Sequence, residues 1–233
     1  MNYSKIIINL PHASVEGLYN QNFSFWKIDN YFINNLLYKW TDWHTDYLFG
    51  GLEHPKVERI RFPYSRFIVD AERLWDDPLE SQGQGIIYYS MDGYQRDVPP
   101  KAKERLLNLW KWHQKRLSNS LVPNSLLLDC HSFPQEIDVD ICIGYNNDWS
   151  KPSPQTIATA VNLFEENGYK VGINYPYSNS ITPSCSYGYK SMMIEVNKKV
   201  YLKKDSIFIT ENSNYKTNIN TLITKLLKMY IAE

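Results

Sequence analysis

Apolar residues fall into short runs separated by segments in which they recur at helical spacing. Runs with almost no polar alternation are typical of strands covered on both faces of a mostly parallel sheet. They predict strands at residues 6–10, 57–62, 67–70, 86–90, 126–130, 139–144, 171–175, 192–196 and 207–210. The helical spacing predicts helices at residues 101–117, 154–167, 217–230 and the later half of 20–43. This alternation predicts one continuous α/β domain over residues 1–233.

Composition and charge narrow the class of protein. The 233 residues, 43% of them hydrophobic, can bury the core of one large domain. The 25 basic and 25 acidic residues cancel, and the basic ones are dispersed, so nucleic acid and anionic membranes are not expected partners. No stretch approaches the roughly 18 apolar residues of a membrane span, and no signal-peptide pattern occurs. We expect a small-molecule substrate, and the oligomeric state is left open.

Cysteine usage points to a reducing compartment. The three cysteines are odd in number and fall in or near apolar segments: Cys130, Cys142 and Cys185. This pattern is typical of reduced, buried thiols and not of a disulfide framework. We therefore expect a cytoplasmic location.

Two histidines each follow a predicted core strand. His12 comes after the run at residues 6–10, and His131 comes after the run at 126–130. In open α/β sheets, ligands bind beyond the carboxyl ends of the strands. Zinc sites in hydrolases often combine two histidines, one carboxylate and an open position for water. Either histidine could instead be structural, but together they predict a metal site.

The residues alone leave three carboxylates open as the third ligand. Glu16 lies four residues beyond His12, while Asp42 and Asp46 would share one helical face if their segment is helical. Asp42 could equally be a helix N-cap. The remaining imidazoles are expected in structural, supporting or surface positions: His44, His54 and His113.

Five short motifs occur in an informative order: Pro-His-Ala-Ser, Thr-Asp-Trp-His-Thr-Asp-Tyr-Leu, Ser-Arg-Phe-Ile-Val-Asp-Ala-Glu-Arg, Asp-Cys-His-Ser and Ile-Glu-Val-Asn-Lys-Lys-Val-Tyr. Together they resemble the N-formylglutamate amidohydrolase family from about residue 5 to about residue 202. The resemblance implies a single-domain, three-layer α/β/α sandwich with a mixed, mostly parallel sheet, as in carboxypeptidase-like and phosphorylase-like folds. It also implies one zinc ion and favours Asp42 as the ligand that joins His12 and His131.

Glu195 lies inside the apolar run Met-Met-Ile-Glu-Val. A carboxylate on a core strand costs free energy unless it is hydrogen-bonded or functional. A partly desolvated glutamate beside an activated water is a natural general base. The alternative is that the strand has one wet face at this point. The resemblance places a glutamate with the catalytic role here.

Arg66, Asp70 and Arg73 form a charged constellation. A guanidinium can grip a carboxylate or stabilise an oxyanion, and a nearby aspartate can hold it in place. An exposed ion-pair cluster is the alternative. We expect Arg66 to stabilise the oxyanion and Arg73 to anchor a substrate carboxylate, with Asp70 and Tyr177 as further substrate-binding residues. Glu72 stands where similar segments carry Asn, which puts an acidic substrate such as N-formylglutamate in question.

These features predict a metal-dependent amidohydrolase that cleaves a small N-acyl amino acid, N-formylglutamate-like, with a zinc-activated water. Manganese, cobalt or iron could occupy the same ligands. One alternative is a carboxypeptidase-like peptidase acting on a peptide or cell-wall fragment. The other is a non-catalytic, metal-containing binding protein, against which the presence of Glu195 argues.

Overall fold

The computed structural model describes residues 2–210 and 215–231, and the chain divides into two compact units. The first, here called the sheet unit, takes its described residues from Met1–Leu10, His44–Ile60 and Leu117–Glu233. The second, the loop unit, consists of Pro11–Trp43 and Arg61–Arg116. No helix in the described ranges is both long enough and apolar enough to cross a membrane.

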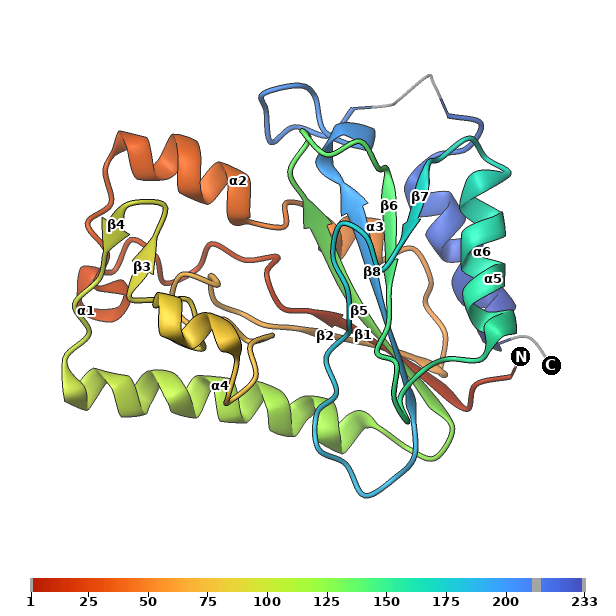
Figure 1. The fold of residues 1–233 in the computed structure, drawn as a ribbon, viewed down its shortest axis with the longest axis horizontal. Helices are drawn as coiled ribbons and strands as arrows, with labels where there is room; N and C mark the ends of the chain where they lie inside the picture. Colours follow the sequence, from red (N-terminus) through yellow and green to blue (C-terminus); the bar gives the residue numbers. More distant parts are fainter. Residues whose placement is uncertain (1, 211–214, 232–233) are drawn as a thin grey trace. The chain divides into compact units, whose positions relative to one another are not determined.

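The sheet unit is built on a six-stranded sheet in the order β2-β1-β5-β8-β6-β7 (Figure 1). Its strands are β1 (Lys5–Leu10), β2 (Val57–Arg61), β5 (Ser125–Phe133), β6 (Ile141–Gly144), β7 (Val171–Ile173) and β8 (Lys190–Asn197). β5 runs parallel to β1 and β8, β7 runs parallel to β6, and β6 is antiparallel to β8. The predicted mixed, mostly parallel sheet is confirmed.

Helices of the sheet unit cover this sheet with apolar faces. Its main helices are α5 (Pro154–Glu165) and α6 (Ile219–Ile231), with the short α3 (Thr45–Leu48). α5 and α6 contact each other and lie together on one side of the sheet (Figure 1). α5 begins where Ser153 accepts a hydrogen bond from the Thr156 amide, with proline in its first turn. Elsewhere on the sheet, Leu117 and Leu121 pack with Ile7 and Leu127.

The loop unit has little regular structure apart from one long helix. Its elements are α1 (Gln21–Ser24), the π-helix η1 (Phe32–Leu37), α2 (Tyr38–Trp40), the 3-10 helix η2 (Pro78–Gln82), β3 (Ser90–Met91), β4 (Tyr94–Gln95) and most of α4 (Pro100–Ser120). A further short 3-10 helix, η3 (Lys198–Val200), follows β8 in the sheet unit. Trp26, Phe32 and Phe67 centre one apolar cluster of the loop unit, while Ile68 and Leu106 belong to another.

Most predicted elements are confirmed, but the strands at residues 67–70, 86–90 and 207–210 are wrong. The first run is buried in loop structure, because the Trp26 indole donates to the Phe67 carbonyl at 2.6 Å and Arg96 donates to the Ile68 carbonyl at 3.1 Å. Side chains therefore satisfy backbone acceptors that a sheet ladder would otherwise occupy. The second run contributes only Ser90 to β3, and the third forms a single bridge through Ile209.

The predicted helices at residues 101–117, 154–167 and 217–230 and in the later half of 20–43 are confirmed, with small shifts at their ends. The single domain over residues 1–233 stays a prediction, because the sheet unit and the loop unit each have their own apolar clusters.

Candidate metal and catalytic site

In the loop unit, His12 lies between two carboxylates. It follows β1 by two residues, and both its ring and Asp70 are almost completely buried. The His12 Nε2 atom is 2.8 Å from Asp70 Oδ1. The Asp42 amide donates to the His12 carbonyl at 3.1 Å, and Asp42 Oδ2 lies 3.6 Å from His12 Nδ1. Each ring nitrogen therefore faces one buried carboxylate.

This geometry fits a metal ligand pair. Two donor atoms about 2.0–2.1 Å from a tetrahedral zinc ion lie roughly 3.4 Å apart, close to the 3.6 Å between His12 Nδ1 and Asp42 Oδ2. Metal-binding histidines almost always donate their other ring N–H to a carboxylate or carbonyl, as His12 does toward Asp70. His12, Asp70 and Glu72 also bring one ligand atom each within 4.8 Å of one another. The loop unit therefore holds a buried group that suits a divalent metal.

Asp70 is the centre of a hydrogen-bond network. Besides His12, its carboxylate accepts hydrogen bonds from Arg66 Nη2 at 2.9 Å, from the Tyr88 hydroxyl and from the Glu72 amide at 3.1 Å. Burial acts to raise the pKa of Asp70, but the charges of His12, Arg66 and the nearby Arg73 outweigh it and hold that pKa well below its ordinary value. Asp70 is therefore ionised and engaged with groups of the loop unit.

The two arginines differ in how firmly they are held. Arg66 donates to the Tyr88 hydroxyl through Nε at 3.2 Å and Nη2 at 3.0 Å, in addition to its bond with Asp70. Arg73 has looser ion-pair partners, with its Nε 3.7 Å from Asp70 and its Nη1 3.8 Å from Asp77. Its buried Nε has no hydrogen-bond acceptor among the described residues. Arg66 is thus fixed in orientation, while Arg73 keeps a donor for a ligand.

In the sheet unit, strand alternation places Asp129 and His131 on the same face of β5. His131 Nε2 lies 3.1 Å from Asp129 Oδ1. Asn9 of the neighbouring β1 donates to the same carboxylate at 2.8 Å, and the Ile181 amide donates at 3.2 Å. Burial acts to raise the pKa of Asp129, but His131 and these donors lower it. A buried, ionised aspartate therefore faces one nitrogen of His131.

Glu195 lies beside His131 in the register of β5 and β8. Its other neighbour in the sheet is Cys142 of β6, whose thiol pKa burial raises to about 11. The Cys142 thiol donates to the Tyr177 carbonyl at 3.2 Å, and the Tyr177 ring packs edge-on against Phe133 at 5.9 Å. Glu195 is therefore buried in the sheet between a histidine and a protonated thiol.

Burial distinguishes the three carboxylates that were candidates for the third ligand. Glu16 and Asp46 are exposed, whereas Asp42 is buried. Asp42 precedes α3 instead of lying on it, so it does not share a helical face with Asp46. The other histidines contact backbone or apolar groups: His44 Nε2 is 2.7 Å from the Ile207 carbonyl, His54 Nδ1 accepts from the Lys56 amide, and His113 packs on Phe62.

Three supporting residues were missed from the sequence: Asp129, Asn9 and Tyr88. Asp129 could have been found, because a spacing of two on a strand places it on the same face as His131. Asn9 could have been found from its place at the end of the first core run. Nothing distinguishes Tyr88 from the other 17 tyrosines in the sequence. His131 itself lies inside β5 and not after it, because the strand continues to Phe133.

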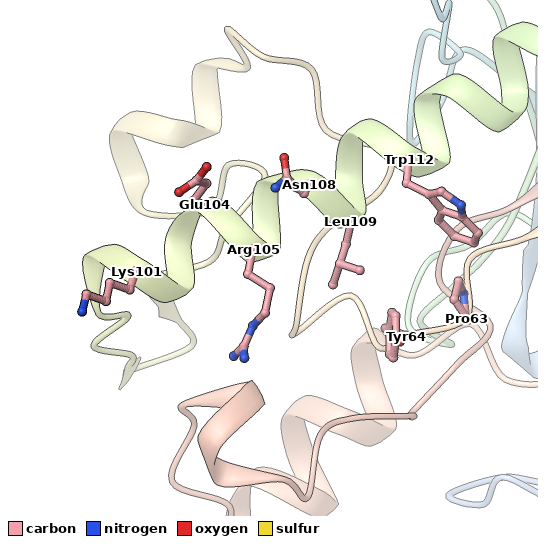
Figure 2. Close-up of a pocket in the computed structure, with 8 residues that line it drawn as sticks. All are labelled: Pro63, Tyr64, Lys101, Glu104, Arg105, Asn108, Leu109 and Trp112. Carbon is pink, nitrogen blue, oxygen red and sulfur yellow. The ribbon is translucent and has the colours of Figure 1, made fainter.

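A separate hollow of about 580 Å³ lies on the loop unit. Its walls include Lys101, Arg105, Leu109 and Trp112 of α4, together with the segment 63–64. Figure 2 shows Leu109 and Trp112 pointing from α4 toward Tyr64 and Pro63. None of the predicted site residues lines this hollow.

Comparisons with known proteins agree on the fold and family. The family model described as N-formylglutamate amidohydrolase matches residues 4–202. An N-formylglutamate amidohydrolase from Ralstonia eutropha JMP134 has a similar structure, with a TM-score of 0.74, 15% identity and coverage of 98% of this chain and 94% of that one. The gene product Atu2144 from Agrobacterium tumefaciens has a TM-score of 0.64, 13% identity and coverage of 97% and 91%. A search of curated protein sequences finds no significant match.

Proposed function

The chain belongs to the N-formylglutamate amidohydrolase family, and we propose that it is a metal-dependent enzyme that cleaves the amide bond of a small N-acyl amino acid. The observation that carries this proposal is the ligand-like pair of His12 Nδ1 and Asp42 Oδ2, 3.6 Å apart, with the opposite nitrogen of His12 held by Asp70. A structural histidine needs no second carboxylate at that spacing.

The proposed ligands are His12 and Asp42 of the loop unit and His131 of the sheet unit, with zinc as the favoured ion. Chain connectivity supports this set, because His12 follows the end of β1 by two residues and β1 pairs with β5, the strand that carries His131. Both histidines have Nε2 facing a buried aspartate, which presents Nδ1 on the other side of each ring. When bound, zinc supplies Lewis-acid polarisation and lowers the pKa of water.

The protein's own groups have distinct roles in the proposed reaction. Glu195 accepts a proton from the attacking water and delivers it to the leaving nitrogen as the C–N bond breaks, which yields a carboxylic acid and an amine. Arg66 donates to the oxyanion that develops on the amide oxygen, and it is preorganised because Tyr88 and Asp70 hold its guanidinium. Its fixed orientation avoids reorganisation during the reaction.

Substrate binding falls to Arg73, with Tyr177 as a further lining group. The unsatisfied Nε of Arg73 is suited to a substrate carboxylate. Asp70 is completely buried and already accepts several hydrogen bonds. We therefore assign it to the positioning of His12 and the arginines instead of direct substrate contact.

Metal analysis of single variants tests the ligand set. His12→Ala and His131→Ala should each lose the metal that the purified parent retains after dialysis, and Asp42→Asn should bind it at least about tenfold more weakly. Asp46→Asn and Glu16→Gln are matched controls, because both carboxylates are exposed, and they should keep one ion per chain. Circular dichroism checks that each variant folds. Retention of tightly bound metal in both histidine variants would show that the proposed site is wrong.

Turnover of a panel of N-acyl amino acids tests the reaction class. The parent loaded with zinc should release free amine from at least one substrate that carries an α-carboxylate. The metal-depleted His12→Ala variant should not. Amine release that is independent of added metal would contradict the proposal.

A further inference from the structure

We propose that Glu72 makes this site select N-acyl amino acids with a neutral or cationic side chain over those with an acidic side chain. The inference rests on the proposed function, because it concerns the same site. It follows from how negative and positive groups are distributed around His12 in the loop unit.

Carboxylates outnumber guanidinium groups in this cluster. Asp42, Asp70 and Glu72 each lie within 3.8 Å of a His12 ring nitrogen, and Asp77 lies 3.8 Å from Arg73. Two guanidinium groups face these four carboxylates, those of Arg66 and Arg73. Metal binding requires a neutral His12 ring, and these four carboxylates and two guanidinium groups then carry two excess negative charges, which one divalent ion balances. The cluster therefore has no positive surplus for a substrate with two carboxylates.

The donors that remain suffice for a single carboxylate. Arg66 is already engaged with Tyr88 and Asp70. Arg73 has Asp70 and Asp77 near its guanidinium, and only its Nε is a buried donor that has no acceptor. The α-carboxylate of an N-acyl amino acid can use that donor. A second, side-chain carboxylate finds no further guanidinium in the cluster.

Exposure identifies Glu72 as the acid that such a side chain would meet. Asp70 is completely buried, whereas the Glu72 side chain is 25% exposed, and its Oε2 lies 3.8 Å from His12 Nε2. The Glu72 charge also acts on both arginines. Two carboxylates a few ångströms apart in a partly buried site repel with little screening by salt. Discrimination by like-charge repulsion of this kind typically amounts to about tenfold to a hundredfold.

Binding of two substrates with the same shape tests the inference. N-formylglutamine and N-formylglutamate differ in their side chains by one charge, and the Glu195→Gln background prevents turnover while titration calorimetry measures Kd. The metal-loaded protein should bind N-formylglutamine at least about tenfold more tightly than N-formylglutamate. Adding Glu72→Gln should reduce this preference to within about threefold, mainly by improving the binding of N-formylglutamate. Adding Glu104→Gln, an exposed control on α4, should leave the preference unchanged.

The outcomes separate the inference from the proposed function. Equal binding of the two ligands, or tighter binding of N-formylglutamate, overturns the selectivity while amide hydrolysis by the parent can still stand. A preference that Glu72→Gln does not reduce overturns the role of Glu72. A preference that Glu72→Gln abolishes supports the inference even if the parent hydrolyses neither ligand, and that result would count against the proposed reaction alone. Failure of both ligands to bind overturns the selectivity, and amine release from the wider panel of N-acyl amino acids then decides the proposed function.

Discussion

The two histidine–aspartate pairs of this chain reach the same local arrangement by different routes. In the sheet unit, Asp129 and His131 lie two residues apart on β5, so the strand itself brings them together. In the loop unit, His12 and Asp70 are 58 residues apart, and loops bring them together. The histidine in both cases has Nε2 at a buried carboxylate. Regular structure and irregular structure therefore both place a buried carboxylate close to the Nε2 atom of a histidine.

The surroundings of the pairs differ more than their geometry. Asp129 is supported by neutral donors, the Asn9 amide group and the Ile181 backbone. Asp70 is supported by Arg66 and the Tyr88 hydroxyl. Where a regular strand fixes the positions of the side chains, hydrogen bonds from neutral donors suffice. Where loops must do so, a charged network supplies the missing constraint, and its integrity becomes more sensitive to the loss of one charge.

The largest effect is expected from Glu195, the proposed base of the sheet unit. Glu195→Gln keeps the shape but removes the proton acceptor, so kcat should fall on the order of 10²- to 10⁴-fold. Metal content and thermal stability should stay near those of the parent. Glu165→Gln on α5 is an exposed control in the same unit and should leave kcat unchanged. Normal turnover by Glu195→Gln would place the base elsewhere, and loss of metal would make Glu195 a ligand.

Replacement of Asp70 and of Asp129 should lower the free energy of unfolding by different amounts. Asp70→Asn leaves the buried Arg66 without its anionic partner and should lower the free energy of unfolding by about 3–5 kcal/mol. Asp129→Asn weakens hydrogen bonds that come mainly from neutral donors and should cost about 1–3 kcal/mol. Urea denaturation of both variants measures the difference. Equal costs would show that the charged network of the loop unit is no more sensitive than the neutral one.

The smallest effect is expected at an exposed ion pair. Lys170 donates to Asp138 and lowers the pKa of its carboxyl. A carboxyl with a lowered pKa contributes stability above its unfolded pKa and loses that contribution only as the pH falls through the folded value. Because solvent screens the pair, this contribution is small, and Asp138→Asn should lower stability at neutral pH only slightly. An NMR titration should show the Asp138 pKa returning toward its ordinary value in Lys170→Ala, and an unchanged pKa would assign the shift to another cause.

The sheet unit was largely predictable from the sequence because its signals are local. The apolar runs at residues 6–10, 126–130 and 192–196 correspond to β1, β5 and β8, and the parallel order brings Glu195 beside His131. The prominence of Glu195 came from a single carboxylate in an apolar run. What the pattern did not show was the end of β5, since polar residues that continue a strand resemble the start of a loop.

The loop unit resisted prediction because its structure depends on contacts between distant residues. Arg96 donates to the carbonyls of Ser24, Ile68 and Tyr88, so one buried side chain holds three segments. Burial lowers the pKa of its guanidinium to about 9. The apolar run at residues 67–70 therefore has the sequence pattern of a strand, although its carbonyls accept hydrogen bonds from side chains. Hydrogen bonds between such distant residues leave no periodic pattern in the sequence.

The alternation of side chains along β5 decides which of its functional groups face the same side of the sheet. Asp129 and His131 face one way, and Cys130, buried between them in the sequence, faces the other. Loss or gain of one residue within this stretch would turn the imidazole to the opposite face and present the thiol in its place. Substitutions at neighbouring positions change size or polarity by degrees, but a one-residue shift exchanges the two faces completely. Over evolution, this segment should therefore accept altered side chains far more readily than altered length.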